Sequence, residues 1–163
     1  MPTAIYPGSF DPITNGHRDI IERAVEVFEH VIVAVLQNTT KSGIFTTPER
    51  VELIRQVVGS NPKVSVESFS GLTADFARQK GVRFLIRGLR AVSDFDAELR
   101  IALMNRKLNP DLDTVFLMTR AENLFLSSST VKEIAMLGGD SSGLVPPVVA
   151  DRLKERFKPA AAG

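Results

Sequence analysis

Cysteine and tryptophan are absent from the chain, histidine occurs only twice, and the charges almost cancel. Without cysteine there can be no disulfide, no thiol nucleophile and no thiolate metal ligand. The two histidines, His17 and His30, are too few for a histidine-rich metal site. Twenty Lys and Arg against nineteen Asp and Glu leave a net charge of +1, whereas a broad nucleic-acid-binding surface needs clustered positive charge. We therefore expect no nucleic-acid partner, although a few cations can still converge on one small anion.

Long apolar segments are absent as well. The longest uninterrupted apolar run is Val31–Leu36, while a membrane-spanning helix needs about 20 such residues. The first residues lack the basic start and the apolar stretch of a targeting signal. These absences predict a soluble, cytoplasmic protein with no membrane partner.

The chain does contain enough apolar material for one compact domain. It has 163 residues, of which 44% are hydrophobic, and both values match a single globular domain. No repeat, low-complexity linker or second domain is visible. We expect one domain over residues 1–158 and a frayed tail over 159–163.

Short runs typical of β-strands alternate with helical patterns from end to end. This alternation is typical of a parallel α/β sheet, in which helices connect successive strands. Val31–Leu36 is apolar throughout, as expected of a strand covered on both faces, whereas Val64–Phe69 alternates and suits an edge. The expected strands are Thr3–Tyr6, Val31–Leu36, Val64–Phe69, Phe84–Arg87 and Thr114–Met118.

The helices are expected between and after these strands. The first carries an apolar stripe at helical spacing, the second begins with Thr47 as its cap, and the third runs from about Thr73 to a stop at Gly81. Ser93 is expected to cap the fourth helix, the fifth begins within Ser127–Thr130, and a sixth follows Pro146 and Pro147. The residues interpreted as core on or beside the later helices are Phe95, Leu99, Ala102, Met104, Met118 and Met136.

Polar residues gather in the loop Tyr6–His17, directly after the first strand. Two prolines and two glycines make this loop irregular, and it delivers Ser9 and Thr14–His17 to the start of a helix. Ligands of parallel sheets bind beyond the carboxyl ends of the strands, and helix N-termini attract anions. His17 is expected over this edge, either facing a ligand or as a cap-region histidine bonded to backbone. The pattern leaves both interpretations open.

Further candidate anion contacts follow the other strands. Lys41, after the second strand, is either a ligand contact or a solvated surface lysine. The two arginines of Arg87–Arg90 can clamp a phosphate or form ordinary salt bridges with Asp94 or Asp96. Ser127–Thr130 places four hydroxyls at a helix start, where capping needs one. The surplus suits a second anion site.

The sequence patterns of several common enzyme classes are missing. There is no Gly-x-x-x-x-Gly-Lys-Ser/Thr loop, no Gly-x-Gly-x-x-Gly after the first strand, and no Gly-x-Ser-x-Gly elbow. These absences disfavour P-loop phosphotransferases, dinucleotide dehydrogenases and serine hydrolases. What remains is a set of cations and hydroxyls that stabilises phosphoryl charge without an evident covalent nucleophile.

Two stretches resemble the signatures of the nucleotidyltransferase superfamily whose members carry a [His/Thr]-x-Gly-His motif. Thr14-Asn15-Gly16-His17 resembles the first signature, and Ser127–Lys132 resembles the second, of the Ile-Ser-Ser-Ser-x-x-[Arg/Lys] type. With Arg87–Arg90 and Lys41 in register, nearly the whole chain is similar to the bacterial phosphopantetheine adenylyltransferase family. Leu126 stands where isoleucine is usual.

This resemblance implies a fold and a reaction. The fold is a Rossmann-like, doubly wound five-stranded parallel sheet of order 3-2-1-4-5, with strands one and four at the switch point. The reaction is transfer of AMP from ATP to 4′-phosphopantetheine, with Mg²⁺, giving dephospho-coenzyme A and pyrophosphate by direct in-line attack. The family implies a homohexamer. The alternatives are another member of the superfamily that uses CTP or a different phosphorylated acceptor, and a non-catalytic adenylate sensor.

The resemblance also assigns residues by position. His17 would stabilise the transition state, with Lys41 and Arg90 as further catalytic residues, and no residue of the chain would ligate a metal. The residues expected to bind phosphopantetheine are Ser9, Lys41, Thr73 and Arg87. Those expected to bind ATP are Ser9, Phe10, His17, Gly88, Leu89, Arg90, Glu98, Asn123, Leu124, Phe125, Leu126, Ser127, Ser128 and Ser129.

Overall fold

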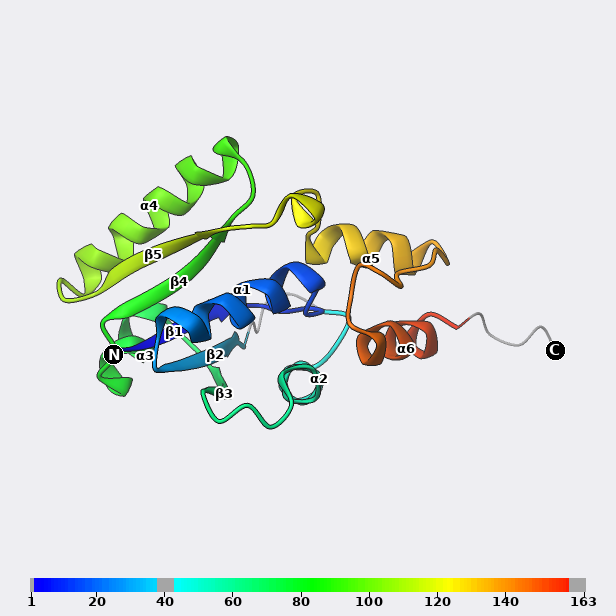
Figure 1. Ribbon diagram of the computed structural model, residues 1–163, viewed down its shortest axis with the longest axis horizontal. Coiled ribbons are helices and arrows are strands. Elements are labelled where there is room, and N and C mark those ends of the chain that lie inside the picture. The colour runs from blue at the N-terminus through cyan, green and yellow to red at the C-terminus, as the bar shows by residue number, and fades with distance from the viewer. Residues whose placement is uncertain (1, 38–42, 159–163) are drawn as a thin grey trace.

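Strands and helices alternate along the chain, as the sequence predicts (Figure 1). The structure is a computed structural model that describes residues 2–37 and 43–158, so Lys41 and the expected tail 159–163 lie outside the described residues. The strands are β1 (Thr3–Gly8), β2 (His30–Leu36), β3 (Val64–Phe69), β4 (Phe84–Leu89) and β5 (Asp113–Met118). The helices are α1 (Asn15–Val27), α2 (Thr47–Val58), α3 (Thr73–Lys80), α4 (Val92–Leu108), the short 3₁₀ helix η1 (Ala121–Asn123), α5 (Ser128–Met136) and α6 (Pro147–Arg156).

The sheet is parallel and has the order β3-β2-β1-β4-β5, which confirms the predicted fold and places β3 at an edge. β1 pairs with β2 along its whole length but with β4 only at Ala4–Phe84 and Ile5–Leu85. β1 and β4 therefore part at the carboxyl edge of the sheet, where the winding reverses. Parallel α/β sheets bind ligands at such a point.

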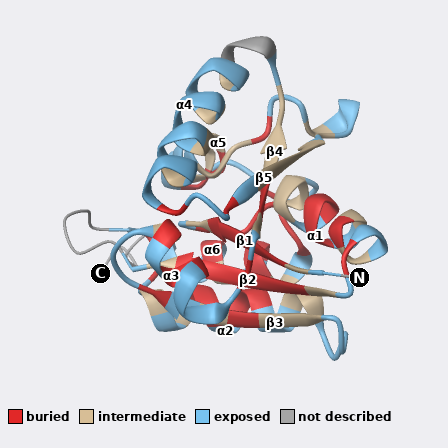
Figure 2. Cartoon of the chain, turned by 90° about the vertical axis from the view of Figure 1, so that its left-hand side faces the viewer, coloured by how far each residue is buried: buried red, intermediate tan, exposed pale blue. Residues whose placement is uncertain are grey.

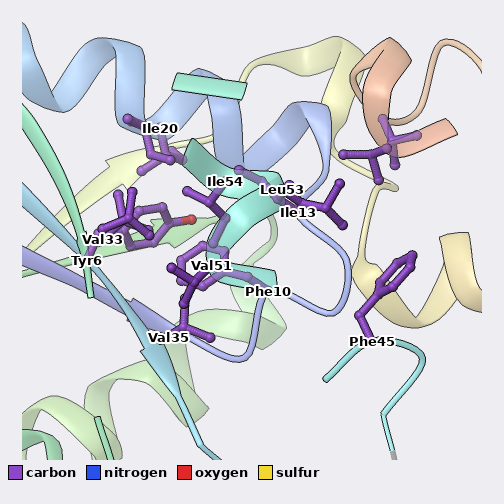
Figure 3. Packing of buried hydrophobic residues seen from close by; sticks show 14 of the residues in the cluster. Tyr6, Phe10, Ile13, Ile20, Val33, Val35, Phe45, Val51, Leu53 and Ile54 are labelled. Carbon is purple, nitrogen blue, oxygen red and sulfur yellow. The ribbon is translucent and has the colours of Figure 1, made fainter. Parts of the chain in front are cut away.

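Helices cover both faces of the sheet and enclose two apolar cores. On one face, α1 and α2 pack with parts of α5 and α6 over the side chains of Ala4, Tyr6 and Val33. Figure 3 shows this packing around Tyr6 and Phe10. On the other face, residues of α3 pack against Ile5 and Leu85. None of the helices that the structure describes is both long and apolar enough to cross a bilayer.

Two of the predicted helix caps are wrong by a residue or more. Thr46, and not Thr47, caps α2, because its side chain accepts the Glu49 N–H while the Glu49 carboxylate accepts the Thr46 N–H. α4 begins at Val92 with Ala91 as its N-cap, so the predicted cap Ser93 lies inside the helix. The end of α3 is as predicted, because Gly81 adopts the left-handed conformation that glycine tolerates.

α4 is mostly exposed and β5 is mostly of intermediate burial, whereas the central strands are buried (Figure 2). Several residues interpreted as core from sequence are exposed there, which corrects that interpretation. Phe95 is 41% exposed, Leu99 is 37% exposed, and Ala102 is half-buried. The methionines expected in the core are also exposed: Met104, Met118 and Met136. Apolar composition alone does not reveal that a helix face lacks a partner within its own chain.

Candidate active site

A cleft of about 330 Å³ opens where β1 and β4 part. Its walls come from the loop after β1, the first turn of α1, the end of β4, α4 and the start of α5. The residues named from sequence that line it are Ser9, Phe10, His17, Arg87, Gly88, Arg90, Glu98, Leu126, Ser127 and Ser128. The sheet topology thus brings together short segments that lie between Tyr6 and Ser128 in the sequence.

The loop after β1 is held in a sharply bent conformation. Phe10 has a φ of 47°, in the left-handed region that residues other than glycine rarely adopt. Its buried ring packs edge-on against Tyr6 at 5.2 Å and against His17 at 5.0 Å between ring centroids. A Cβ on Gly8 would lie 3.1 Å from this ring, so Gly8 leaves Phe10 the room to stand beneath the imidazole.

His17 uses one ring nitrogen to cap its own helix. The Thr14 N–H donates to His17 Nδ1 at 3.0 Å, and the His17 N–H donates to Thr14 Oγ1 at 3.3 Å. Because Nδ1 accepts, the proton of the neutral ring lies on Nε2. Burial lowers the pKa of His17 to about 4, with Arg87 and Arg90 adding to the effect. The cap interpretation is therefore confirmed, and it leaves Nε2–H as a neutral donor on a ring that lines the cleft.

Arg87 spans the gap between β4 and β1. Its Nη1 donates to the Pro7 carbonyl oxygen at 3.0 Å, while Nε and Nη2 donate to the two carboxylate oxygens of Glu98, each at 2.8 Å. Although burial opposes it, hydrogen bonding and charge attraction from Glu98 raise the pKa of Arg87 above its usual value. Glu98 thus orients the guanidinium in the wall of the cleft.

Arg90 lies on the other side of the cleft and holds the chain leading to α5. Its Nη1 donates to the Leu126 carbonyl oxygen at 2.9 Å, and its Nε lies 3.3 Å from Asp94 Oδ2. The expected salt bridge with Asp94 is therefore present. It does not remove Arg90 from the cleft, which both side chains line.

The three serines Ser127, Ser128 and Ser129 differ in their contacts at the start of α5. Ser127 is the cap of α5, because its Oγ accepts the Thr130 N–H at 3.1 Å. Ser128 Oγ donates to the Pro12 carbonyl oxygen at 2.9 Å and so fastens α5 to the loop after β1. Ser129 is exposed.

Not every residue named for ATP binding lines the cleft of the described structure. Leu124 and Phe125 are 46% and 63% exposed and lie outside the described cleft walls, as do Leu89, Asn123 and Ser129. Asn123 is nevertheless close, because its Cβ lies 3.9 Å from the position that a Cβ on Gly16 would occupy.

A second cavity, of about 230 Å³, adjoins the first. The two share Pro7, Gly8, Ser9, Arg87 and Glu98, and Thr73 lines only the second. Its remaining walls are mostly apolar and come from Leu36, Phe69, Leu85, Ile101 and Ala102, with Asn105 and Thr114 as polar exceptions. The residues expected to bind phosphopantetheine thus lie around this cavity, apart from Lys41, which is outside the described residues.

Sequence reasoning missed Asp11 and Arg50. Asp11 follows Phe10 in the bent loop, and Arg50 in α2 is only 6% exposed. A signal was available, because Arg50 precedes Val51 on the apolar side of a helix whose Leu53 and Ile54 are buried. A charged residue on such a face needs a partner.

Comparison with known proteins identifies the family. The family model described as Cytidylyltransferase-like matches residues 5–134. A phosphopantetheine adenylyltransferase of Clostridium kluyveri is 57% identical over 160 residues, which cover 98% of this chain and 98% of the relative. One of Heliobacterium modesticaldum is 55% identical over 157 residues, or 96% and 94% of the two chains. The chain belongs to the phosphopantetheine adenylyltransferase family.

Solved structures show the same fold at much greater sequence distance. Nicotinic acid mononucleotide adenylyltransferase of Plasmodium falciparum, complexed with NaAD, has a TM-score of 0.71 at 14% identity and covers 95% of each chain. The same protein complexed with APC has a TM-score of 0.68. In this member of the phosphopantetheine adenylyltransferase family, the two signature stretches lie at the starts of α1 and α5, on two walls of one cleft.

Proposed function

We propose that the protein transfers the adenylyl group of ATP to 4′-phosphopantetheine and forms dephospho-coenzyme A and pyrophosphate, a step of coenzyme A biosynthesis. The names of relatives above 50% identity support this activity. The observation that carries it is the pair of adjoining cavities that share Ser9, Arg87 and Glu98. The first offers cationic and hydroxyl donors for a nucleotide, and the second offers an apolar wall for the pantetheine arm. The transferred phosphorus would lie where the cavities meet.

The acceptor needs no general base. The second pKa of a phosphate monoester is near 6, so the acceptor is largely a dianion at pH 7. The obstacle to the reaction is the electrostatic repulsion between this dianion and the triphosphate of ATP. Catalysis therefore consists of holding the two anions in line and of placing donors where charge develops.

His17 and Arg90 are the described donors best placed for this task. His17 offers a neutral Nε2–H to an oxygen of the α-phosphate, and its low pKa keeps it neutral at pH 7. Arg90 adds a positive charge on the side of the cleft where α5 begins, and the helix N-terminus adds free N–H groups. Leu126, Ser127 and Ser128 form the wall beside the phosphates.

Mg²⁺ is proposed to enter with ATP, bound by phosphate oxygens. Among the described residues, no three His, Asp or Glu side chains are grouped so that the protein alone would enclose a metal ion. Both carboxylates that line the cleft, Asp94 and Glu98, are paired with arginines. These side chains do not fit a metal site held by the protein, so no step is assigned to one.

We further propose a cytoplasmic homohexamer. The cytoplasm supplies ATP, and the family resemblance implies the hexamer. The exposed apolar side chains of α4 support the assembly, because a lone domain rarely leaves so many large apolar groups on one helix in water. They are Phe95, Leu99, Ile101, Leu103, Met104 and Leu108.

The decisive experiment is turnover with defined substrates. The purified protein is mixed with ATP or CTP and with phosphopantetheine or other phosphorylated acceptors, and pyrophosphate release is followed. We expect turnover with ATP and phosphopantetheine together. Preference for CTP or another acceptor would contradict the substrate assignment, and binding of ATP without any turnover would indicate an adenylate sensor.

A further inference from the structure

A buried ion pair outside the proposed chemistry holds the loop between β1 and α1. Asp11 Oδ1 lies 3.5 Å from Arg50 Nε, and the two side chains are 13% and 7% exposed. Asp11 belongs to the bent loop, whereas Arg50 belongs to the first turns of α2. Burying two charges is costly unless their remaining polar atoms also find partners.

Those partners are present and are all backbone groups. Asp11 Oδ2 accepts the Ile44 N–H and Oδ1 accepts the Phe45 N–H, both at 2.9 Å. Arg50 Nε donates to the Phe45 carbonyl oxygen at 2.8 Å, and Nη1 donates to the Ser9 carbonyl oxygen at 3.3 Å. The pair therefore joins three stretches of backbone at fixed positions.

Glycine at position 43 is required by this arrangement. A Cβ there would lie 2.2 Å from Arg50 Nη2 and 2.4 Å from Asp11 Oδ2. Any side chain would displace one of the two charged groups. The pair is thus packed so tightly that the backbone beside it has no room for a methyl group.

The loop that the pair holds is the strained one beneath His17. Phe10, with its left-handed φ of 47°, stands between Ser9 and Asp11, and such a conformation persists only where its surroundings enforce it. On one side of Phe10, the Ser9 carbonyl oxygen accepts a hydrogen bond from Arg50. On the other side, the carboxylate of Asp11 is held by the Ile44 and Phe45 N–H groups. The ring of Phe10 then meets the imidazole of His17 at 5.0 Å.

We infer that Asp11 and Arg50 are positioning residues for the adenylyl transfer. They fix Ser9 and Phe10, and Phe10 in turn fixes the imidazole of His17 against the cleft. The inference rests on the proposed function. A displacement of about 1 Å at a reacting group can cost on the order of 100-fold in rate. Arg90 is held by a contact outside this loop, to the Leu126 carbonyl oxygen, so most of the ATP affinity should survive loss of the pair.

The test compares the same substitution at two arginines of one helix. Arg50→Lys keeps the charge but cannot reach both the Ser9 and the Phe45 carbonyl oxygens. We expect its kcat to fall by about tenfold or more, while KM for ATP stays within about twofold. Arg55→Lys is the matched control, because Arg55 also contacts one backbone carbonyl, that of Val66, away from the cleft. It should leave kcat unchanged.

A double-mutant cycle separates positioning from general stability. If Arg50 acts through His17, Arg50→Lys should cost little further kcat in a His17→Ala background, because the group it positions is gone. The inference would be overturned if the fold-loss of kcat in the double variant equalled the product of the two single fold-losses. An Arg50→Lys enzyme with native kcat would overturn it as well. Wild-type turnover is measured in parallel, since its absence would contradict the proposed function instead.

A second variant serves if Arg50→Lys does not fold. Gly43→Ala keeps both charged residues in the chain but adds a methyl group that must displace one of the two side chains. A loss of kcat at nearly constant KM for ATP supports the inference here too. Native kcat in a Gly43→Ala protein whose cooperative thermal unfolding is unchanged would contradict it.

Discussion

Among the single residues of the cleft, His17 shows how one ring can serve the fold and the substrate at once. Nδ1 accepts the Thr14 N–H in a capping box, and Nε2–H remains for the cleft. Removal of one oxyanion-type donor costs on the order of 10²–10³ in kcat. We predict a loss of this size for His17→Ala in the turnover assay, with a smaller change in KM for ATP. A near-native kcat would make His17 a helix cap alone.

The low pKa of His17 also has a consequence for stability. The pKa of His17 is about 4 in the folded protein and 6.5 at its ordinary value, so the imidazole is harder to protonate in the folded protein. Protonation therefore favours the unfolded chain, so stability is complete above pH 6.5 and declines as the pH falls from 6.5 toward 4. The linkage amounts to up to about 3 kcal/mol.

The variant His17→Asn isolates this contribution, because its amide oxygen can still accept the Thr14 N–H but does not titrate. We predict that urea unfolding shows a smaller loss of stability between pH 6.5 and pH 4 for His17→Asn than for the wild type. Parallel curves over this range would show that the imidazole is not protected from protonation.

At the scale of elements, the end of β4 supplies two arginines with different neighbours. Arg87 lines both cavities, whereas Arg90 lines only the nucleotide cleft. We predict that Arg87→Ala weakens phosphopantetheine more than ATP and that Arg90→Ala does the reverse, as titration with each ligand separately would show. Lys41→Ala is expected to behave like Arg87→Ala, on the family correspondence alone. Equal losses for both ligands would contradict the division.

The start of α5 offers a second test at this scale. Ser127→Ala removes the cap and should lower stability by about 1 kcal/mol without ligand. Ser129 lies outside the described cleft walls, and only the family resemblance assigns its hydroxyl to ATP. On that assignment, Ser129→Ala should melt like the wild type without ATP, but with a smaller upward shift when ATP is added. If both variants keep the full ATP shift, these hydroxyls serve the helix only.

Local signals in the sequence account for most of the fold and for part of the site. The parallel α/β class, the stop of α3 at Gly81 and the cleft over β1 and β4 follow from alternation, glycine placement and switch-point geometry, whereas the strand order rests on the family resemblance. The Arg87–Glu98 and Asp11–Arg50 pairs were not predicted. The first joins the consecutive elements β4 and α4, and the second joins the loop after β1 to α2, but in neither case does a local pattern specify which acid meets which arginine. The same limit explains the misassigned core of α4, because an apolar pattern on a helix does not show whether its own chain covers that helix.

At the scale of the whole molecule, the exposed face of α4 predicts assembly. Leu103 and Met104 are 57% and 64% exposed, and burying such a side chain stabilises an interface by about 1.5–3 kcal/mol. We predict that the protein sediments as a homo-oligomer and that Leu103→Glu produces a smaller species, because the carboxylate would be desolvated without a partner.

The control for this prediction is Val27→Glu, since Val27 is 47% exposed at the end of α1, on the opposite face of the sheet from α4. This variant should sediment like the wild type, because its added charge remains in water. A wild-type protein that sediments as a monomer, or a Leu103→Glu variant of unchanged size, would show that α4 is not the contact. Because all the described walls of the cleft, including the part of α4 that carries Asp94 and Glu98, come from one chain, a dissociated variant that still folds should keep its affinity for ATP.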